Sequence, residues 1–599
     1  MLKNLATKIK WFSKKINFRY AFKKQEVHKK FPWTSLGISI TILIIAFISI
    51  SKINGDTAVI HSFFDNFKKL FHFADYHDGE YDVYTISDTF SKSIRFILKT
   101  IGIAFIGTII GSVCSLPLAF LASKNTIKYK AIYIPVRIAL SLLRAFPPIL
   151  IAYLFKFEFL PDTNGILTIS IFVASIMSKW MYEEFDSIDL NAQIMLESFG
   201  ANKWIAFKNG ILPQVKQKYI SLCLYSFEMT VRFASILGVV GLTGIGVLID
   251  RYKSIPDAWG HLFIVILVIV VFVIFVELLS WLIKKYILDF KVKDYSENFK
   301  SNNFKSEKEA IDWTLKNPRR IWIPNFILTI IIISLTIYFF INLNLGFQRN
   351  TNQFPILLKA IFKPDWKYIT TWSNENAIKL AFEALGMVIC SILIGTILAI
   401  PIGLIASKNI VPLYVSSVFR FILILIRSVP AYLYAIIFFL GAPIESKNFV
   451  GALALGIHAI GMMGKLIAES ADNIDKETLV AGEAFGMGIF SKMKYIIWKE
   501  VKPQVFSTAI YRLEVNFKQT VMLGALGISS FGYEMLNATS SINSFGKASS
   551  FIIVTIAVVL FLEQISNITR LKINRGYIFR KPRHKYNDEY YQNINLNKI

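Results

Sequence analysis

Residues 225–241 read YSFEMTVRFASILGVVG and place Glu228 and Arg232 inside a run that is otherwise apolar enough for lipid. Residues 511–527 read YRLEVNFKQTVMLGALG and carry an acid and a base at the same spacing. The two glutamates, Glu228 and Glu514, lie 286 positions apart. The same offset relates Lys179 to Lys465, Glu197 to Glu483, Gly200 to Gly486 and Gly246 to Gly532. One element has therefore been used twice in this chain.

The composition indicates a membrane protein. Of the 599 residues, 54% are hydrophobic and 15% are aromatic, and the mean hydropathy is +0.50, which exceeds what a soluble protein of this size requires. The net charge is +26, but the basic residues cluster between apolar runs and form no basic and aromatic face for a nucleic acid. We therefore expect membrane lipid around the chain and no nucleic-acid partner.

The cysteines give no sign of a disulfide framework or a metal site. Cys114, Cys223 and Cys390 all fall in apolar segments, and their spacing is not that of metal ligands. We expect no bound metal.

Apolar runs of about 20 residues are long enough to cross a bilayer as helices. Such runs occur near 35–53, 96–121, 132–155, 165–182, 218–240, 260–285, 321–343, 377–401, 413–440, 449–467, 504–528 and 548–568. Six lie on each side of a polar linker. The sequence therefore predicts an all-α polytopic membrane protein with about 12 transmembrane helices in two six-helix repeats, which an even number of spans makes parallel.

The predicted domains follow from these spans and from the distribution of charge. They are an N-terminal segment at 1–34, a first repeat at 35–290, a linker at 291–320, a second repeat at 321–569 and a basic tail at 570–599. The first 34 residues hold ten Lys and Arg against one acid, which predicts a cytoplasmic N-terminus, and an even number of crossings returns the tail to that side. Residues 2–22 have the pattern of an amphipathic interfacial helix.

Two long loops carry the first family resemblance. They read LESFGANKWIAFKNGILPQV at 196–215 and GEAFGMGIFSKMKYIIWKEVKPQV at 482–505. They resemble the EAA loop of bacterial ABC importer permeases, a coupling helix that docks in the ATPase subunit. The residues that match are Glu197, Gly200, Ala201 and Pro213 in the first loop, and Glu483, Ala484, Gly486 and Pro503 in the second. Ile194 stands where a glutamate is usual, and Pro503 lies four residues beyond the position that the offset predicts.

Further motifs narrow the resemblance. RAFPPILIAYLF at 144–155, RSVPAYLYAIIF at 427–438 and the repeated acid–base element before paired glycines look like the phosphonate-type permeases of that superfamily. The resemblance covers about 96–250 and 377–532, and this chain looks like two copies fused. It implies a type I ABC importer permease fold in the bacterial plasma membrane. The implied function is binding-protein-dependent, ATP-driven import of phosphonates or related phosphorylated small molecules.

The resemblance also implies partners. The sequence contains no G-x-x-x-x-G-K-[ST] phosphate loop, so ATP and Mg are expected on two copies of a partner ATPase subunit, with no cofactor and no catalytic residue in this chain. An extracellular solute-binding protein or lipoprotein is expected to deliver the substrate. The alternatives are a secondary transporter with parallel repeats, an ABC importer of the same fold for another solute, and a membrane-embedded enzyme.

The charged residues in the apolar runs allow three interpretations. Glu228 with Arg232, and Glu514 with Lys518, are spaced i,i+4 and can pair on one helix face. They could clamp neighbouring helices, line the translocation path or act as a gate, because an intramembrane charge usually faces a bundle interior or a watery cavity. Arg144 and Arg427 precede proline-containing span starts, where we expect them to snorkel to headgroups.

Overall fold

The computed structural model describes residues 19–22, 25–28, 58–73, 75–78, 82–127, 129–188, 190–238, 242–253, 255, 258–285, 309, 322–348, 354–439, 443–539 and 544–575. The predicted span at 35–53, nearly all of the linker at 291–320 and the tail beyond 575 lie outside these residues. The described chain is predominantly helical, as expected. It adds two antiparallel hairpins, β1 (Arg19–Phe22) with β2 (Gln25–His28), and β3 (Tyr76–Asp78) with β4 (Asp82–Tyr84).

The expected interfacial helix at 2–22 is wrong for its last four residues. Arg19–Phe22 forms strand β1, which pairs with β2 so that Tyr20 lies opposite Val27. Aromatic and β-branched residues favour extended backbone, and the two-residue connection suits a hairpin. Residues 2–18 of that expectation lie outside the described part of the chain.

Besides the four strands, the described residues of the first half form eleven helical elements. They are α3 (Ala58–Leu70), α4 (Ile86–Ala122), α5 (Lys130–Ala145), α6 (Pro148–Phe155), α7 (Pro161–Ser187), α8 (Asn191–Ser198), α9 (Lys203–Ala206), a π-helix (Phe207–Ile211), α10 (Leu212–Leu237), α11 (Gly246–Lys253) and α12 (Trp259–Ile283).

The second half comprises α15 (Trp322–Asn342), α16 (Phe354–Ile361), α17 (Lys367–Thr370), α18 (Ala377–Ile405), α19 (Leu413–Ser428), α20 (Ala431–Phe439), a 3₁₀ turn (Ile444–Ser446), α21 (Lys447–Asp472), α22 (Lys476–Ala484), α23 (Ile489–Lys492), a π-helix (Met493–Ile497), α24 (Trp498–Gly524), α25 (Ser530–Thr539) and α26 (Phe545–Arg575). From α18 onward, the helices of the second half repeat the order from α4 to α12, with one 3₁₀ turn added. The second π-helix begins 286 positions after the first, which is the offset found in the sequence.

Seven of the described helices are long and apolar enough to cross a membrane, or nine when each of two bent pairs counts as one span. Helix α24 is not among them, because its sequence is less apolar, yet its 27 residues extend over about 40 Å. The chain is therefore a multi-pass membrane protein. The finer number of twelve spans stays a prediction.

Two predicted spans are broken at proline. Helices α5 and α6 meet at 84°, and α19 and α20 meet at 76°. Pro147 and Pro148 stand at the first break and Pro430 at the second. Proline has no backbone N–H and its ring clashes with the preceding turn, so the helix ends before it. The predicted spans at 132–155 and 413–440 each become a long helix followed by a short one.

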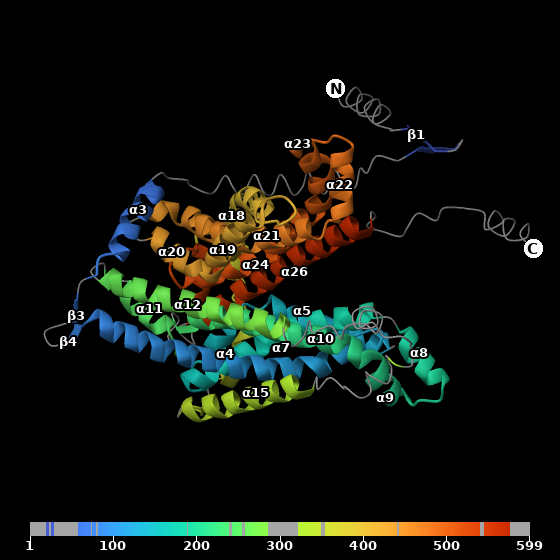
Figure 1. Cartoon of the computed structure of the whole chain (residues 1–599). Coiled ribbons are helices and arrows are strands. Elements are labelled where there is room, and N and C mark those ends of the chain that lie inside the picture. The colour runs from blue at the N-terminus through green and yellow to red at the C-terminus, as the bar shows by residue number, and fades with distance from the viewer. Residues whose placement is uncertain are drawn as a thin grey trace, which may run out of the picture.

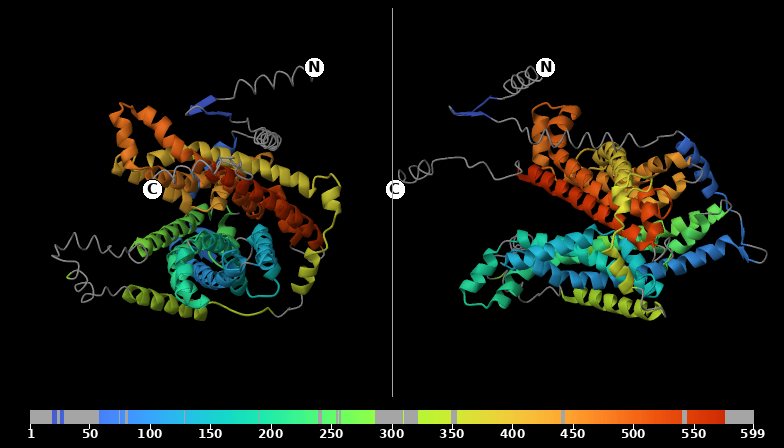
Figure 2. Two further views of the ribbon diagram at one scale, coloured as in Figure 1. Left: turned by 90° about the vertical axis from the view of Figure 1, so that its right-hand side faces the viewer. Right: turned by 180° about the vertical axis from the view of Figure 1, so that it is seen from behind.

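The helices form two bundles that lie side by side (Figures 1 and 2). Helix α4 packs along α7 in one bundle, and α18 packs along α21 in the other. The pairs α8–α9 and α22–α23 both lie on the side of the molecule that is away from α3 and the β3–β4 hairpin (Figure 1). Loops at one end are what parallel copies of a unit require.

The elements that precede each half's main helices reach across to the other bundle. Helix α15 packs on α4 of the first half, where Phe339 lies 5.8 Å from Phe105 between ring centroids. Helix α3 contacts both α12 and α20, and α16 contacts both α26 and α6. The two halves are therefore interleaved and not merely apposed.

Candidate functional site

A cavity of about 730 Å³ lies between the two bundles. Its walls come mainly from α7 and α10 in the first half and from α20, α21 and α24 in the second. Small-molecule sites in proteins typically enclose about 300–1,000 Å³ and combine apolar walls with a few polar groups. The cavity has the size and position of a path for a small solute.

The two acid–base pairs that the sequence singled out are formed. Arg232 contacts Glu228, and Lys518 Nζ lies 2.8 Å from Glu514 Oε1. All four side chains are largely buried, and Arg232, Lys518 and Glu514 line the cavity. The predicted i,i+4 pairing is confirmed. A role for these residues in the path or a gate stays a prediction.

Two further arginines make ion pairs that cross from one half to the other. Arg144 on α5 contacts Glu563 on α26, and Arg427 on α19 contacts Glu277 on α12. Glu277 and Glu563 are themselves 286 positions apart. Arg144 and Arg427 are only 7% and 4% exposed, so the expectation that they snorkel to headgroups is wrong. A carboxylate of the opposite half satisfies each guanidinium in the interior. We call Arg144–Glu563 and Arg427–Glu277 the crossed pairs.

The surroundings of the crossed pairs differ between the halves. Arg427 also reaches Glu228 at 3.0 Å, so two carboxylates serve it. Glu563 instead serves two cations, because Lys179 Nζ lies 2.9 Å from its Oε1. In the described part of the chain, Arg144 has no carboxylate other than Glu563.

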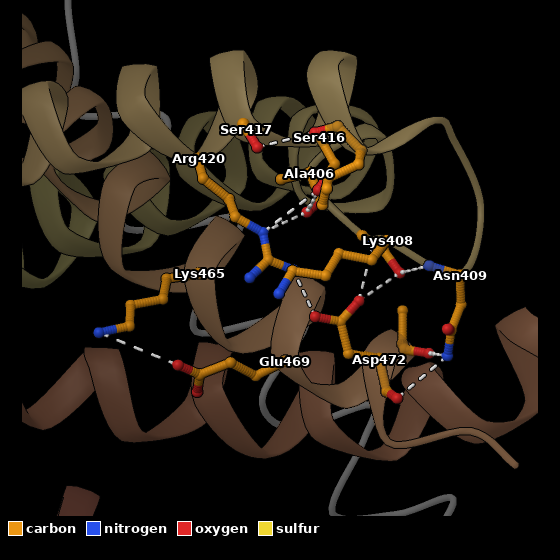
Figure 3. A network of polar contacts seen from close by, with 12 residues as sticks. Ala406, Lys408, Asn409, Ser416, Ser417, Arg420, Lys465, Glu469 and Asp472 are labelled. Atoms are coloured by element: carbon orange, nitrogen blue, oxygen red, sulfur yellow. Dashed lines mark hydrogen bonds and ion pairs between the residues drawn. The ribbon is translucent and has the colours of Figure 1, made fainter. Parts of the chain in front are cut away.

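A second repeated motif fixes the end of α21 near the α22–α23 loop (Figure 3). The Asp472 carboxylate accepts hydrogen bonds from Ser407 Oγ and the Lys408 N–H, each at 2.8 Å, and pairs with Arg420. Arg420 Nε donates to the Ala406 carbonyl at 2.8 Å. One aspartate thus ties the turn after α18, the middle of α19 and the end of α21 together.

The first half builds the same motif around Asp186. Ser123 Oγ and the Lys124 N–H donate to Asp186 Oδ1 at 2.9 and 3.0 Å, and Arg137 Nη2 donates to Oδ2 at 2.7 Å. This gives a structural reason for the repeated A-S-K-N tetrapeptide at 122–125 and 406–409. Its serine and backbone amides position the aspartate just before the projecting loop.

The two projecting loops turn in the same way. Gly200 N–H donates to the Glu197 carbonyl and Ala201 N–H to the Leu196 carbonyl, both at 3.0 Å, which is a Schellman cap. Gly486 and Met487 repeat these bonds with Glu483 and Gly482. Gly200 and Gly486 have φ of 87° and 73°, a conformation that costs about 1–2 kcal/mol for a residue with a Cβ. The glycines that the sequence selected are therefore required by the turn.

The loops differ where their prolines stand. Pro213 is within the first turn of α10, whereas Pro503 lies inside α24. Both prolines follow a π-helix of five residues. The two π-helices keep the offset of 286, whereas the two prolines do not. At the tips, Phe199 and Phe485 are 84% and 85% exposed. Glu197 and Glu483 are exposed on the last turns before them.

The glycines after the charged elements permit close contact between backbones. A Cβ on Gly238 would lie 2.7 Å from the Gly246 Cα, and one on Gly524 would lie 2.1 Å from the Gly532 carbonyl carbon. Helix α11 therefore packs directly on the end of α10, and α25 on the end of α24. Gly241, a member of the repeated set, lies outside the described residues.

Sequence reasoning missed Glu277, Glu563 and Arg512. Each glutamate is the one acid in an apolar run, VIFVELLSW at 273–281 and LFLEQ at 560–564, and their shared offset could have paired them. Arg512 has no basic equivalent, because Ser226 stands 286 positions before it. Comparison of the two halves for identical residues cannot identify a position at which they differ.

Residues 399–568 match the family described as "Binding-protein-dependent transport system inner membrane component". The chain is 25% identical over 492 residues to the phosphate-import permease protein of Mycolicibacterium smegmatis, which covers 80% of this chain and 85% of that protein. It is 28% identical over 208 residues to a phosphite transport system permease protein of Stutzerimonas stutzeri, covering 35% and 73%. It is 23% identical over 542 residues to the ABC transport system permease protein p69 of Mycoplasma genitalium, covering 87% and 94%.

The crossed pairs predict unequal effects of two equivalent substitutions. Glu563→Gln leaves Arg144 with no carboxylate in the described structure and should cost about 3–5 kcal/mol of stability, because an uncompensated buried charge remains. Glu277→Gln should cost much less, since Arg427 keeps Glu228 at 3.0 Å. Thermal unfolding of the purified full chain in one detergent, wild type beside both variants, measures the difference. Equal losses would contradict the assignment of partners.

Proposed function

We propose that this chain is a binding-protein-dependent permease of an ABC importer. Its substrates are phosphonates or related phosphorylated small molecules, which it carries across the bacterial plasma membrane. The family match and the relatives support the assignment as a permease, and the relatives' names concern phosphate and phosphite. The observation that carries the proposal is a cavity lined by basic side chains between two halves that each bear a matching loop at the same end.

The loops suit docking to an ATPase subunit. Each presents an exposed phenylalanine, Phe199 or Phe485, next to an exposed acid on a turn held by a Schellman cap. The aspartate motif connects each loop to the main helices of its bundle. A displacement of the loop would thus move the joined ends of α4, α5 and α7, or of α18, α19 and α21, as one unit.

The assembly that we infer has two parallel repeats of about six helices each, two copies of an ATPase subunit and one extracellular solute-binding protein or lipoprotein. ATP and Mg are held by the ATPase subunits, and both termini of this chain are cytoplasmic. Support for the repeats comes from the shared offset of the π-helices, from the two proline-broken spans and from the two Schellman caps.

Uptake in proteoliposomes tests the proposed function. The chain is reconstituted with the ATPase and the solute-binding protein of the same organism, and radiolabelled methylphosphonate is supplied outside. We expect uptake that requires ATP and the binding protein. Uptake driven by an ion gradient in vesicles that lack the ATPase would instead identify a secondary transporter.

The Schellman caps generate a prediction about coupling. Gly486→Val should reduce uptake while leaving membrane abundance unchanged, because a β-branched residue is strained at φ of 73° although no atom lies within 4 Å of its Cβ. Gly488→Val is the matched control, since Gly488 has equally open surroundings and no positive φ. ATP hydrolysis and uptake are measured together. Equal activity of the two variants would remove the coupling assignment.

The acid–base pairs generate a prediction about the path. Glu228→Gln with Arg232→Gln, combined with Glu514→Gln and Lys518→Gln, removes both members of each pair, so no lone charge remains and abundance should be normal. Arg427 keeps Glu277 in this variant. If the cations attract an anionic substrate, uptake should fall at least about tenfold. Uptake at the wild-type level would leave the clamp as their role.

A further inference from the structure

Arg512 differs from the other cations around the cavity. It lies on α24, is 2% exposed and lines the cavity wall. Its Nη2 is buried without a hydrogen-bond partner, and no ion pair to Arg512 is formed within the described residues.

The remaining inner cations each have an acid. Arg144 and Lys179 share Glu563, Arg232 and Arg427 share Glu228 with Glu277, and Lys518 has Glu514. A guanidinium between membrane helices is unfavourable without a counter-charge, and such residues mark substrate pathways. Among the buried cations that line the cavity, Arg512 is therefore the one without an ion pair in the described part of the chain.

The two halves line the cavity with different chemistry. His458, Arg512 and Gln519 of the second half correspond, at the offset of 286, to Phe172, Ser226 and Phe233 of the first. Phe172 and Phe233 both line the cavity, and their ring centroids are 5.3 Å apart. Gln519 Oε1 is buried and unpaired, two turns from Arg512 on the same face of α24. At these three equivalent positions the second half is polar or basic, whereas the first half has two phenylalanines and a serine.

We propose that this cavity is itself a binding site for an organic phosphonate or phosphate monoester, with the anionic group on Arg512 and the organic group against Phe172 and Phe233. A guanidinium donates two parallel N–H bonds to phosphonate oxygens, and the Gln519 amide nitrogen can donate another. The aromatic rings cover the organic group. The site rests on the proposed function. It adds that the permease itself selects among substrates, besides the selection made by the binding protein.

Phenylphosphonate is the probe that matches both the guanidinium of Arg512 and the rings of Phe172 and Phe233. The purified full chain is placed in nanodiscs of phosphatidylcholine, and binding is followed by ³¹P NMR titration, with inorganic phosphate as the second probe. We expect saturable phenylphosphonate binding that weakens at least tenfold in Arg512→Gln and is partly kept in Arg512→Lys. Phe172→Ala should weaken phenylphosphonate more than phosphate. Arg95→Gln, at an exposed position on α4, is the matched control and should bind as wild type.

Gln519→Glu keeps the test decisive if Arg512→Gln fails to fold. It preserves side-chain size and places a carboxylate in the cavity, so it should abolish phenylphosphonate binding. Unchanged binding in either folded variant overturns the site. Phosphatidic acid added to the nanodiscs should not compete, and competition would overturn the assignment to a soluble substrate in favour of a lipid headgroup.

The outcome separates the site from the transport function. Saturable binding without ATP-driven uptake by the assembled complex would support the site and contradict the importer. ATP-driven uptake by a wild-type chain that binds no phenylphosphonate would contradict the site and leave the importer standing.

Discussion

Charge buried among membrane helices is the constraint on which the arrangement of the two halves depends. A single arginine at the centre of a membrane helix costs roughly 2.5–3.5 kcal/mol even on insertion scales, so it must find a carboxylate or water. Arg144 and Arg427 find theirs in the opposite half, on the last helix of that half. The crossed pairs therefore join the bundles at the edge of the cavity, where sliding of one bundle against the other would separate charges. The interleaved contacts of α3, α15 and α16 hold the halves together elsewhere.

The cost of buried charge also explains why one departure from the repeat, Arg512, is of interest. The two acid–base pairs on α10 and α24 repeat at the offset of 286 and are formed in both halves, as a structural framework requires. Arg512 neither repeats nor forms an ion pair within the described chain, and it lines the same cavity as Phe172 and Phe233 of the first half. A fused chain can change one copy without changing the other, which a homodimer cannot do. An asymmetric cavity suits an asymmetric solute that has one anionic end.

Much of this architecture could be predicted from the sequence, because the apolar runs and the offset are local or periodic patterns. The acid–base pairs on α10 and α24 and the turns at Gly200 and Gly486 were found in this way. The crossed pairs were not, since Arg144 and Glu563 are 419 positions apart and no helix period relates them. The packing of α15 on α4 likewise depends on tertiary contact. The broken spans could be located at their prolines, whereas the 84° and 76° bends depend on the neighbouring helices.

A double-mutant cycle between Arg144 and Glu563 tests most directly whether an ion pair between the halves holds them around the cavity. Thermal stability is measured for wild type, Arg144→Gln, Glu563→Gln and the double variant in the same detergent. If the pair is formed, the double variant should lose less stability than the two single variants lose together. The difference, the interaction energy, should be about 1–3 kcal/mol. Losses that add, with an interaction energy near zero, would contradict it.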